Sequence, residues 1–497
     1  MSPQVSLEDR VDRLLETHCR LEARYRSAIR MAYLGMSNRE IADRLYETVR
    51  TVEGWFNRGP ISRICGRTRG EVTTYVLGLF ALEGTPEPFA VNLRGSTVDF
   101  LVGQYQRFLK LTPEPSVVAR DQTGARAMIP GDYVRRGGTT YPVVFFPAGS
   151  NRLLQRVLSP DNLDASGASR ELSRDQRQPT WLEERRRRFA PPEDDAERRL
   201  RDQNLWAICV DEVFATDEGP ELRAHLARYF DAMDSCDAMI SELAALGDSD
   251  LRLVERQMPI RAAHHSRGPT VNPLVNGDGR AAALGMSALV AFPDRDGRLY
   301  VLLGHRGTGV ATYASCWHVV PSGMAGWRFA PLGKPDAPDG STMSAHGYKS
   351  TYLESAILRE YSEELFNHPE EAWEDESTVR RHEAVTALLN NYGARIEFTG
   401  IAVDLVNLRF EVCALIFVGD PRYYDERHFD PGWEHGPQGV YAVPVGEVAA
   451  STEEQLIVRQ MTPGNTVPTG AAALWAGVDR ARELLAEYRQ PREILTF

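Results

Sequence analysis

The sequence predicts a multidomain chain that is all-α at its N-terminus and α/β in its middle and C-terminal parts. Three observations support this fold class. The 497 residues exceed a single domain at roughly 150 residues per domain. Apolar residues recur at three- and four-residue spacing between residues 6 and 83, which is typical of helices. From residue 283 onward, short apolar runs separated by turns are followed by a helical pattern, which indicates strands and helices together. The expected domains are therefore 1–83, 84–280 and 281–497.

The balance of charge excludes a generally basic protein that coats nucleic acid, and it singles out one region as an exception. Lys and Arg number 57 against 69 Asp and Glu, which gives a net charge of −12. Between Arg20 and Arg69, however, eleven arginines stand against five acidic residues. Because the phosphates of nucleic acids attract positive charge, we expect any contact with nucleic acid in this region.

Cysteine usage and hydropathy indicate the compartment. The six cysteines are scattered and form no Cys-x-x-Cys pair, which argues against a disulfide framework and a structural zinc site. The N-terminus carries charged residues within its first ten positions and lacks the apolar stretch of a secretion signal, and no run of 18 apolar residues follows. We therefore expect a cytoplasmic protein without a membrane partner.

The middle region has an α/β pattern of no recognised type. Strands are predicted at residues 141–146 and 204–210. An amphipathic helix is predicted over 221–246, where Leu222, Leu226 and Phe230 have core spacing. The polar segments 161–202 and 258–281 are expected to be linkers, and the latter would hold His264 and His265 as exposed loop residues.

Residues 31–45 and 48–58 have the form helix, short turn, helix. Ser37 is placed to cap a helix, with Glu40 at the capping-box position three residues later. Apolar side chains would pack between the two helices, namely Ile41, Ala42, Leu45, Val49, Val52 and Phe56. The outward set would then be Arg50, Thr51, Glu53, Asn57 and Arg58, which suits reading base edges and clamping phosphates in a major groove.

The run Gly35, Ser37, Glu40, Ile41, Ala42, Leu45 resembles the helix-turn-helix of LuxR-type regulators and of the fourth region of sigma factors. The resemblance implies a double-stranded DNA partner, with Arg50, Thr51, Asn57 and Arg58 as the candidate DNA-binding residues, and it favours a homodimer on paired half-sites. Two features depart from the pattern: the aromatic pair Trp55-Phe56, and Gly54, which costs about 1 kcal/mol relative to Ala within a helix. The alternative is a helical hairpin that serves packing or dimerisation.

The C-terminal part carries an acidic helix behind a strand-rich segment. A hairpin is predicted over 287–303, with Arg306 after it and a strand that ends in a turn at Gly323. In the helix predicted at 354–365, Glu360, Glu363 and Glu364 share one flank, where like charges disfavour a helix. Mg²⁺ or Mn²⁺ would offset this repulsion, bridge to diphosphate oxygens and lower the pKa of an attacking water. The alternative is a solvated acidic face.

This order of features resembles the Nudix hydrolases, and Ala356, Arg359, Glu360, Glu363 and Glu364 match the second half of their signature helix. The resemblance implies an α/β/α sandwich around a mixed sheet, closed by later strands and a final helix at 394–398, 408–418, 440–448 and 471–488. It makes Glu360, Glu363 and Glu364 metal ligands and catalytic residues, and it gives Arg359 the catalytic role of holding helix and loop together. Arg306 and Gly323 become candidate substrate-binding residues.

Several positions depart from the Nudix pattern. The upstream glutamate falls on Thr351, and whether Glu354 substitutes for it is open. Phe366 stands where a glycine is expected, and the loop over 326–350 is longer than the family's. Glu397 or Glu411 is either a further ligand or a solvent-facing strand residue, and we favour the second.

Two functions from different classes follow. The chain is either a Nudix-type pyrophosphohydrolase of a nucleoside diphosphate linked to another moiety, or a DNA-binding regulator whose Nudix-like domain senses such a nucleotide without hydrolysis. The two overlap in a nucleotide-responsive transcriptional regulator with a hydrolytic domain, which is our hypothesis.

Overall fold

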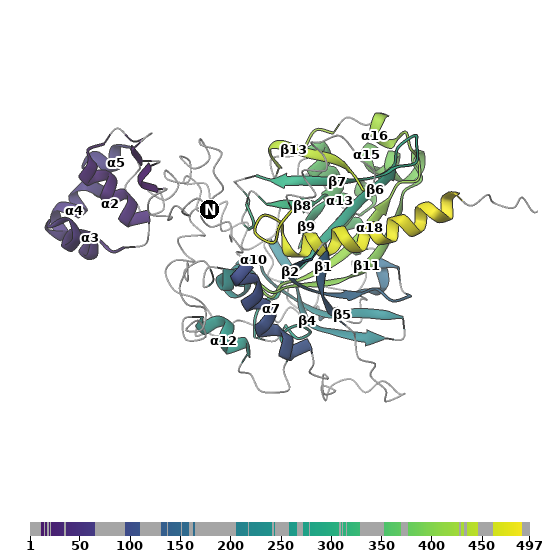
Figure 1. Ribbon diagram of the computed structural model, residues 1–497, viewed down its shortest axis with the longest axis horizontal. Coiled ribbons are helices and arrows are strands. Elements are labelled where there is room, and N and C mark those ends of the chain that lie inside the picture. The colour runs from purple at the N-terminus through teal and green to yellow at the C-terminus, as the bar shows by residue number, and fades with distance from the viewer. Residues whose placement is uncertain are drawn as a thin grey trace, which may run out of the picture. The chain divides into compact units, whose positions relative to one another are not determined.

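A computed structural model describes ten stretches of the chain, several with short internal gaps. They are residues 11–64, 95–109, 131–164, 205–243, 258–307, 310–328, 352–368, 376–431, 435–445 and 461–489. Most of the expected linker at 161–202, Gly35, Thr351 and the long loop after residue 328 lie outside the described residues. The described residues belong to two compact units, one from the first 90 residues and one from residue 95 onward (Figure 1).

The first unit contains helical residues at 11–13 and 15–16, followed by four helices around one small core. These four are α2 (Ala23–Tyr33), α3 (Asn38–Leu45), α4 (Val49–Asn57) and α5 (Pro60–Ile64). Apolar side chains from all four meet in this core, among them Ile29 of α2, Ile41 of α3, Val52 of α4 and Ile61 of α5. The expected helix, short turn, helix arrangement is present as α3 and α4, joined by a turn at residues 46–48.

The second unit is built on a mixed sheet that has nine strands among the described residues. Its main path runs β1 (Asp132–Arg136), β2 (Thr139–Pro147), β11 (Arg395–Asp404), β12 (Phe410–Phe417), β6 (Leu284–Pro293), β7 (Leu299–Arg306) and β13 (His435–Pro444). β8 (Trp317–Val319) pairs with β7, and β9 (Ser322–Met324) pairs with β6. β12 and β6 run parallel and the other pairs run antiparallel, which confirms the mixed sheet. Strands from both sides of residue 281 share this sheet.

Helices cover both faces of the mixed sheet. On one face α13 (Tyr352–Phe366) buries the predicted stripe Leu353, Ile357, Tyr361 and Leu365. On the other face α18 (Pro468–Arg489) crosses β2, β11, β12 and β6 (Figure 1). Side chains of β6 alternate between the two cores, as expected for a strand: Met286, Ala288 and Val290 pack on the α13 side, and Leu289 and Ala291 on the α18 side.

Short elements complete the second unit near α13 and the sheet edges. They are α7 (Gly95–Leu109), the 3-10 turn η1 (Leu154–Arg156), α14 (Glu376–Arg381), α15 (Glu383–Thr386), the π-turn η7 (Ala387–Asn391) and α16 (Tyr423–Glu426). Among the described residues, no helix combines the length and the apolar character needed to cross a membrane.

A second, smaller sheet shows that the helix predicted over 221–246 is wrong in its first half. The sheet runs β10 (Gly326–Arg328), β4 (Leu205–Thr216), β5 (Gly219–Arg228) and β3 (Leu163–Asp164). Leu222 and Leu226 lie on β5, because a four-residue spacing also places both side chains on one face of a strand. Helical structure begins only at α10 (Tyr229–Ala232) and continues in the π-turn η4 (Met233–Asp237).

The described residues of the segment 258–281 pack into the second unit, so the expectation of a linker is wrong for them. It contains α12 (Pro259–His265), in which Arg261 is 1% exposed and His264 is buried. The Arg261 guanidinium donates hydrogen bonds of 2.7 Å to the Leu405 carbonyl and to the Tyr105 hydroxyl. These bonds compensate for its burial. The polar residues of this segment therefore hold the loop between β11 and β12.

Candidate functional sites

Glu360 lies against Gly323, which is the middle residue of β9. The sequence predicted a turn at Gly323, but the turn lies at residues 320–321, before the strand. A Cβ at position 323 would stand 2.3 Å from the Glu360 Cδ, so only a glycine allows the carboxylate to come this close. The structure thus brings Gly323 and Glu360 together, as the sequence-based hypothesis needs. Their proximity follows from two elements: β9 pairs with β6, and α13 packs across β9 and β6.

Glu364 is the most buried carboxylate of α13 and is held at both oxygens. Its Oε1 accepts a 2.7 Å hydrogen bond from the Ser322 backbone N–H, and its Oε2 lies 3.2 Å from His435 Nε2. Burial first, and the charge of Glu360 second, raise the pKa of Glu364 to about 8. At neutral pH the side chain therefore keeps its proton unless another positive charge approaches.

Arg359 lies between the carboxylates of Glu360 and Glu363. Its Nη2 is 2.8 Å from Glu360 Oε1, and its Nε is 3.6 Å from Glu363 Oε1. The side chains of all three residues are at most 14% exposed. The guanidinium therefore supplies an internal positive charge to the acidic flank, where the resemblance places a residue that holds helix and loop together.

Arg306, at the end of β7, adds positive charge to the same end of the sheet. Its charge lowers the pKa of Glu364 and also that of Glu411, opposing the larger effect of burial. His318 of β8 is buried nearby, and burial, followed by the charges of Arg306 and His435, lowers its pKa well below the usual value. His318 is therefore neutral, and Arg306 is the cation that faces this region from β7.

The chemistry of these donors suits a hard divalent cation. Burial, followed by the charge of Glu360, raises the pKa of Glu364, and Mg²⁺ or Mn²⁺ bound to both carboxylates would favour the ionised form of Glu364. Among the described residues, however, no three His, Cys, Asp or Glu side chains are already gathered as a metal cage. The Arg359 guanidinium instead bridges Glu360 and Glu363, and it would have to yield part of this contact to a metal ion.

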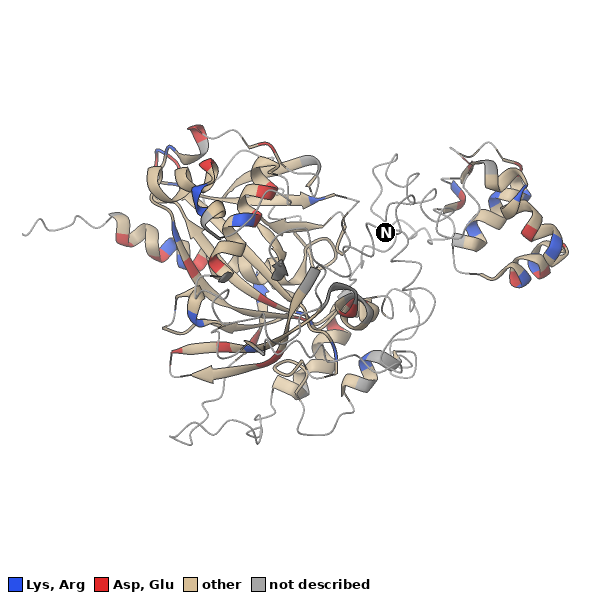
Figure 2. Ribbon diagram, turned by 180° about the vertical axis from the view of Figure 1, so that it is seen from behind, with Lys and Arg blue, Asp and Glu red and all other residues tan. Residues whose placement is uncertain are grey.

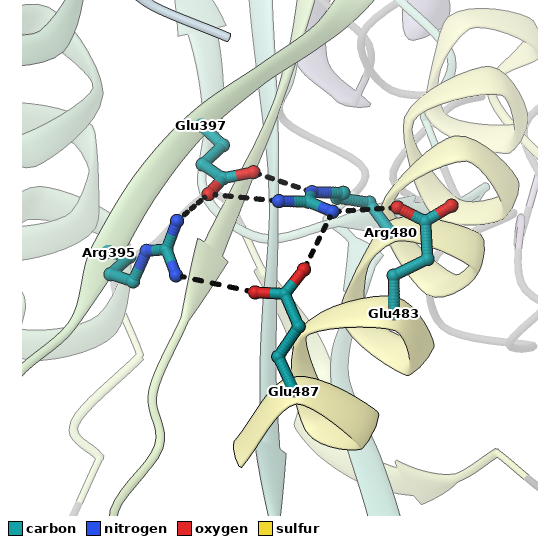
Figure 3. A network of polar contacts seen from close by, with 5 residues as sticks. All are labelled: Arg395, Glu397, Arg480, Glu483 and Glu487. Atoms are coloured by element: carbon teal, nitrogen blue, oxygen red, sulfur yellow. Dashed lines mark hydrogen bonds and ion pairs between the residues drawn. The ribbon is translucent and has the colours of Figure 1, made fainter. Parts of the chain in front are cut away.

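The other candidate glutamates have separate roles. Glu354 pairs with Arg380 of α14 at 2.9 Å, on the first turn of α13. Glu397 is 5% exposed, which contradicts a solvent-facing position, and it pairs with Arg480 at 2.7 Å and with Arg395 (Figure 3). These ion pairs fasten α18 to β11. Glu397 is thus part of the fold.

Glu411 is enclosed by small and hydroxylated residues. Its carboxylate approaches Gly285, where a Cβ would lie 2.9 Å from Oε2, and it accepts a hydrogen bond from the Ser287 hydroxyl. Burial raises its pKa to about 7, although a hydrogen bond from Thr469 opposes this shift. Glu411 meets strand β6 and the first turn of α18.

Sequence reasoning missed two groups that hold Glu364. The Ser322 N–H is a backbone donor, and no residue type signals its position. His435 comes from β13, and the pairing of His435 with Arg306 across β13 and β7 brings it to the site. The only available signal was the expected closing strand, which begins five residues earlier than the sequence suggested.

The helix-turn-helix candidate is capped and packed largely as expected. The Glu40 backbone N–H donates to the Ser37 hydroxyl, and Glu40 Oε2 accepts from the Ser37 N–H at 2.7 Å, which confirms the capping box. Trp55 is buried with its ring edge-on to Tyr25 at 5.2 Å, so the unusual aromatic pair belongs to the core. The sequence predicted Val49 in this core, but it is 37% exposed.

The four candidate DNA-binding residues lie on α4 and at its end. Arg50, Asn57 and Arg58 are exposed, whereas Thr51 is half-buried. Thr51 also belongs to the helix cap: its N–H donates to Thr48 Oγ1 at 3.1 Å, and the two hydroxyls are 2.8 Å apart. The structure therefore leaves two arginines and an asparagine as the accessible polar groups among the four.

Comparison with protein-family models and with curated protein sequences finds no match to this chain.

Proposed function

We propose that the chain is a nucleotide-responsive transcriptional regulator: a Nudix-type, metal-dependent hydrolase of a nucleoside diphosphate linked to another moiety, joined to a DNA-binding helix-turn-helix. The observation that carries the proposal is the arrangement of α13 against β9. Glu360 and Glu364 converge on Ser322 and Gly323 of this strand, and Arg306 brings positive charge to the same region. Carboxylates for a divalent cation beside an arginine for phosphate are what hydrolysis of a diphosphate requires.

Each residue of the site has a separate role in the proposed hydrolysis. A cation held by Glu360 and Glu364 would neutralise the diphosphate and lower the pKa of an attacking water. Glu363 would accept the proton of that water, because Glu360 and Glu364 would be occupied by the cation. The water oxygen bonds to phosphorus as the bond to the bridging oxygen breaks, and the leaving phosphate takes the electron pair. Arg306 attracts the phosphate, and Arg359 holds the helix flank.

A second candidate function rests on Arg359. Because this side chain already neutralises Glu360 and Glu363, the unit would bind a nucleotide phosphate without holding the metal needed for turnover. The protein would then be a nucleotide sensor, with the same DNA-binding unit.

Turnover of a defined panel separates the two candidates. The full chain is incubated with Mg²⁺ and ADP-ribose, NAD or nucleotide sugars, and Glu363→Gln and Glu364→Gln are compared with the parent. Glu383→Gln is the matched control, because Glu383 is an exposed glutamate of α15. We expect both site variants to lose at least about 100-fold in kcat/KM, since each removes a ligand or base. A parent that turns over none of the panel yet binds a member supports the sensor.

DNA binding is tested by selecting bound fragments from random double-stranded DNA. We expect Arg50→Ala and Arg58→Ala to bind the selected fragment more weakly, because both side chains are exposed on α4 or its end. Arg295→Ala is the control, since Arg295 is an exposed arginine of the second unit. Equal binding by all three variants and the parent would show that α4 is not the DNA-reading helix. Sedimentation of the full chain tests the predicted homodimer, and the cytoplasmic location stays a prediction.

A further inference from the structure

Tyr46 occupies the turn between α3 and α4 and contributes little to packing. Its side chain is 97% exposed, the highest value among the exposed large hydrophobic residues of the described chain. Aromatic side chains ordinarily bury much of their surface, because transfer of the ring out of water is favourable. The ring of Tyr46 gains none of this free energy.

The backbone at Tyr46 is also one that tyrosine adopts reluctantly. Tyr46 is the C-cap of α3, with φ 55° and ψ 41° in the left-handed region, and its N–H donates to the Ala42 carbonyl. This position favours Gly or Asn, because the Cβ of other residues meets the backbone there. Both its exposure and its conformation thus argue that Tyr46 is not there to stabilise the fold.

Tyr46 lies in the turn that leads into α4, among two basic residues, Arg44 and Arg50, and two acidic ones, Asp43 and Glu47. Tyr46 stands two residues before Thr48, the N-cap of α4, and the exposed Arg50 follows within the first turn of that helix. Arg44, also exposed, precedes it by two residues. Described helices of this unit carry several such Arg positions interspersed with acidic ones (Figure 2). An exposed tyrosine hydroxyl in the turn before a helix that is proposed to read DNA is one of the groups that position a protein on a DNA backbone.

We propose that Tyr46 is a DNA-backbone contact, in which the phenol hydroxyl donates a hydrogen bond to a phosphate and the ring lies against a deoxyribose. The inference rests on the proposed DNA-binding function and extends it from the recognition helix to the turn before it. The contact sets the register of α4 on the duplex, and it carries no base specificity of its own.

The test compares stability and DNA affinity in the same variants of the full chain. Tyr46→Gly removes the side chain and relieves the backbone, so we expect hydrogen exchange of α3 and α4 to be unchanged or slower than in the parent. Affinity for the selected DNA fragment falls about tenfold, because both the hydrogen bond to the phosphate and the contact of the ring with the deoxyribose are lost. Tyr46→Phe keeps the ring, so its affinity for the DNA fragment falls by a smaller factor. Tyr488→Ala, which removes another exposed tyrosine, leaves the affinity unchanged.

Salt dependence gives a second readout. Because Tyr46 is uncharged, Tyr46→Gly keeps the parent's slope of log K against log salt, whereas Arg50→Ala reduces the slope by about one. A parent that binds DNA while Tyr46→Gly binds equally well overturns this inference and leaves the proposed function standing. Unchanged DNA affinity together with lost self-association in Tyr46→Gly also overturns it, since the tyrosine then faces a second copy. A parent that binds no DNA overturns both proposals.

Discussion

Asp404 is a buried carboxyl group whose surroundings favour its neutral form. It lies at the end of β11, where Oδ1 accepts a 2.8 Å hydrogen bond from the Val406 N–H and Oδ2 accepts one from the Tyr313 hydroxyl. Burial raises its pKa to about 6, although these hydrogen bonds and the charges of Arg261 and Arg409 oppose the shift. Burial is therefore the larger effect at this position.

This pKa predicts how the free energy of unfolding changes with pH. Between about pH 4 and pH 6 the unfolded chain ionises Asp404 while the folded chain keeps the proton, so stability falls as pH rises through this window. The loss amounts to roughly 3 kcal/mol, from about two pKa units at 1.36 kcal/mol each. Asp404→Asn should abolish this component in urea unfolding measured at half-unit intervals, whereas Asp296→Asn, at an exposed turn, should follow the parent. Parallel curves for Asp404→Asn and the parent would contradict the assignment.

At the scale of elements, the end of α18 is fastened to β11 by a small ionic network. Glu397 of β11 contacts Arg480 at 2.7 Å, and Arg480 also reaches Glu483 at 2.7 Å and Glu487 at 3.6 Å (Figure 3). The Glu397 side chain is 7% exposed and that of Arg480 is 16% exposed, whereas Glu483 and Glu487 are mostly exposed. Of these partners, Glu397 is thus the one whose carboxylate cannot regain contact with water unless the helix moves.

Removing Arg480 should leave a buried carboxylate with only Arg395 to compensate it. We expect Arg480→Met to lower the free energy of unfolding by about 2 kcal/mol, less than for complete loss of a buried ion pair. Arg482→Met is the matched control on the same helix. Its side chain is 52% exposed and 3.9 Å from Asp479, so its loss should cost below about 0.5 kcal/mol. Equal losses in urea unfolding would show that Glu397 has no special dependence on Arg480.

The same elements show what sequence patterns could and could not predict. The stripe of α13 was predictable because Leu353, Ile357, Tyr361 and Leu365 recur every four residues and all face one core. The same spacing failed at Leu222 and Leu226, because cross-strand pairing with β4 decided between helix and strand. Within the candidate site, the glutamates share one helix and could be found together. His435 could not, because only strand pairing brings it to Glu364.

At the scale of the whole molecule, the net charge of −12 is unevenly distributed. Positive charge prevails in the region from Arg20 to Arg69, whereas the second unit holds the buried carboxylates of α13. The proposed function assigns phosphates to both units: a DNA backbone to the first, and a diphosphate, through a cation and Arg306, to the second. A regulator further requires that occupancy of one unit changes the affinity of the other.

That requirement yields a quantitative prediction, because coupling between two binding equilibria is reciprocal. If a nucleotide changes the Kd for the selected DNA fragment by some factor, the fragment must change the Kd for the nucleotide by the same factor, typically about 5- to 150-fold in allosteric proteins. Both constants are measured by titration in the full chain, using Glu363→Gln so that hydrolysis does not deplete the nucleotide. Because Arg306→Ala weakens nucleotide binding, we expect this variant to need a higher nucleotide concentration for the same change in the Kd for DNA. If neither ligand changes the Kd for the other, the hydrolase and DNA-binding units act independently.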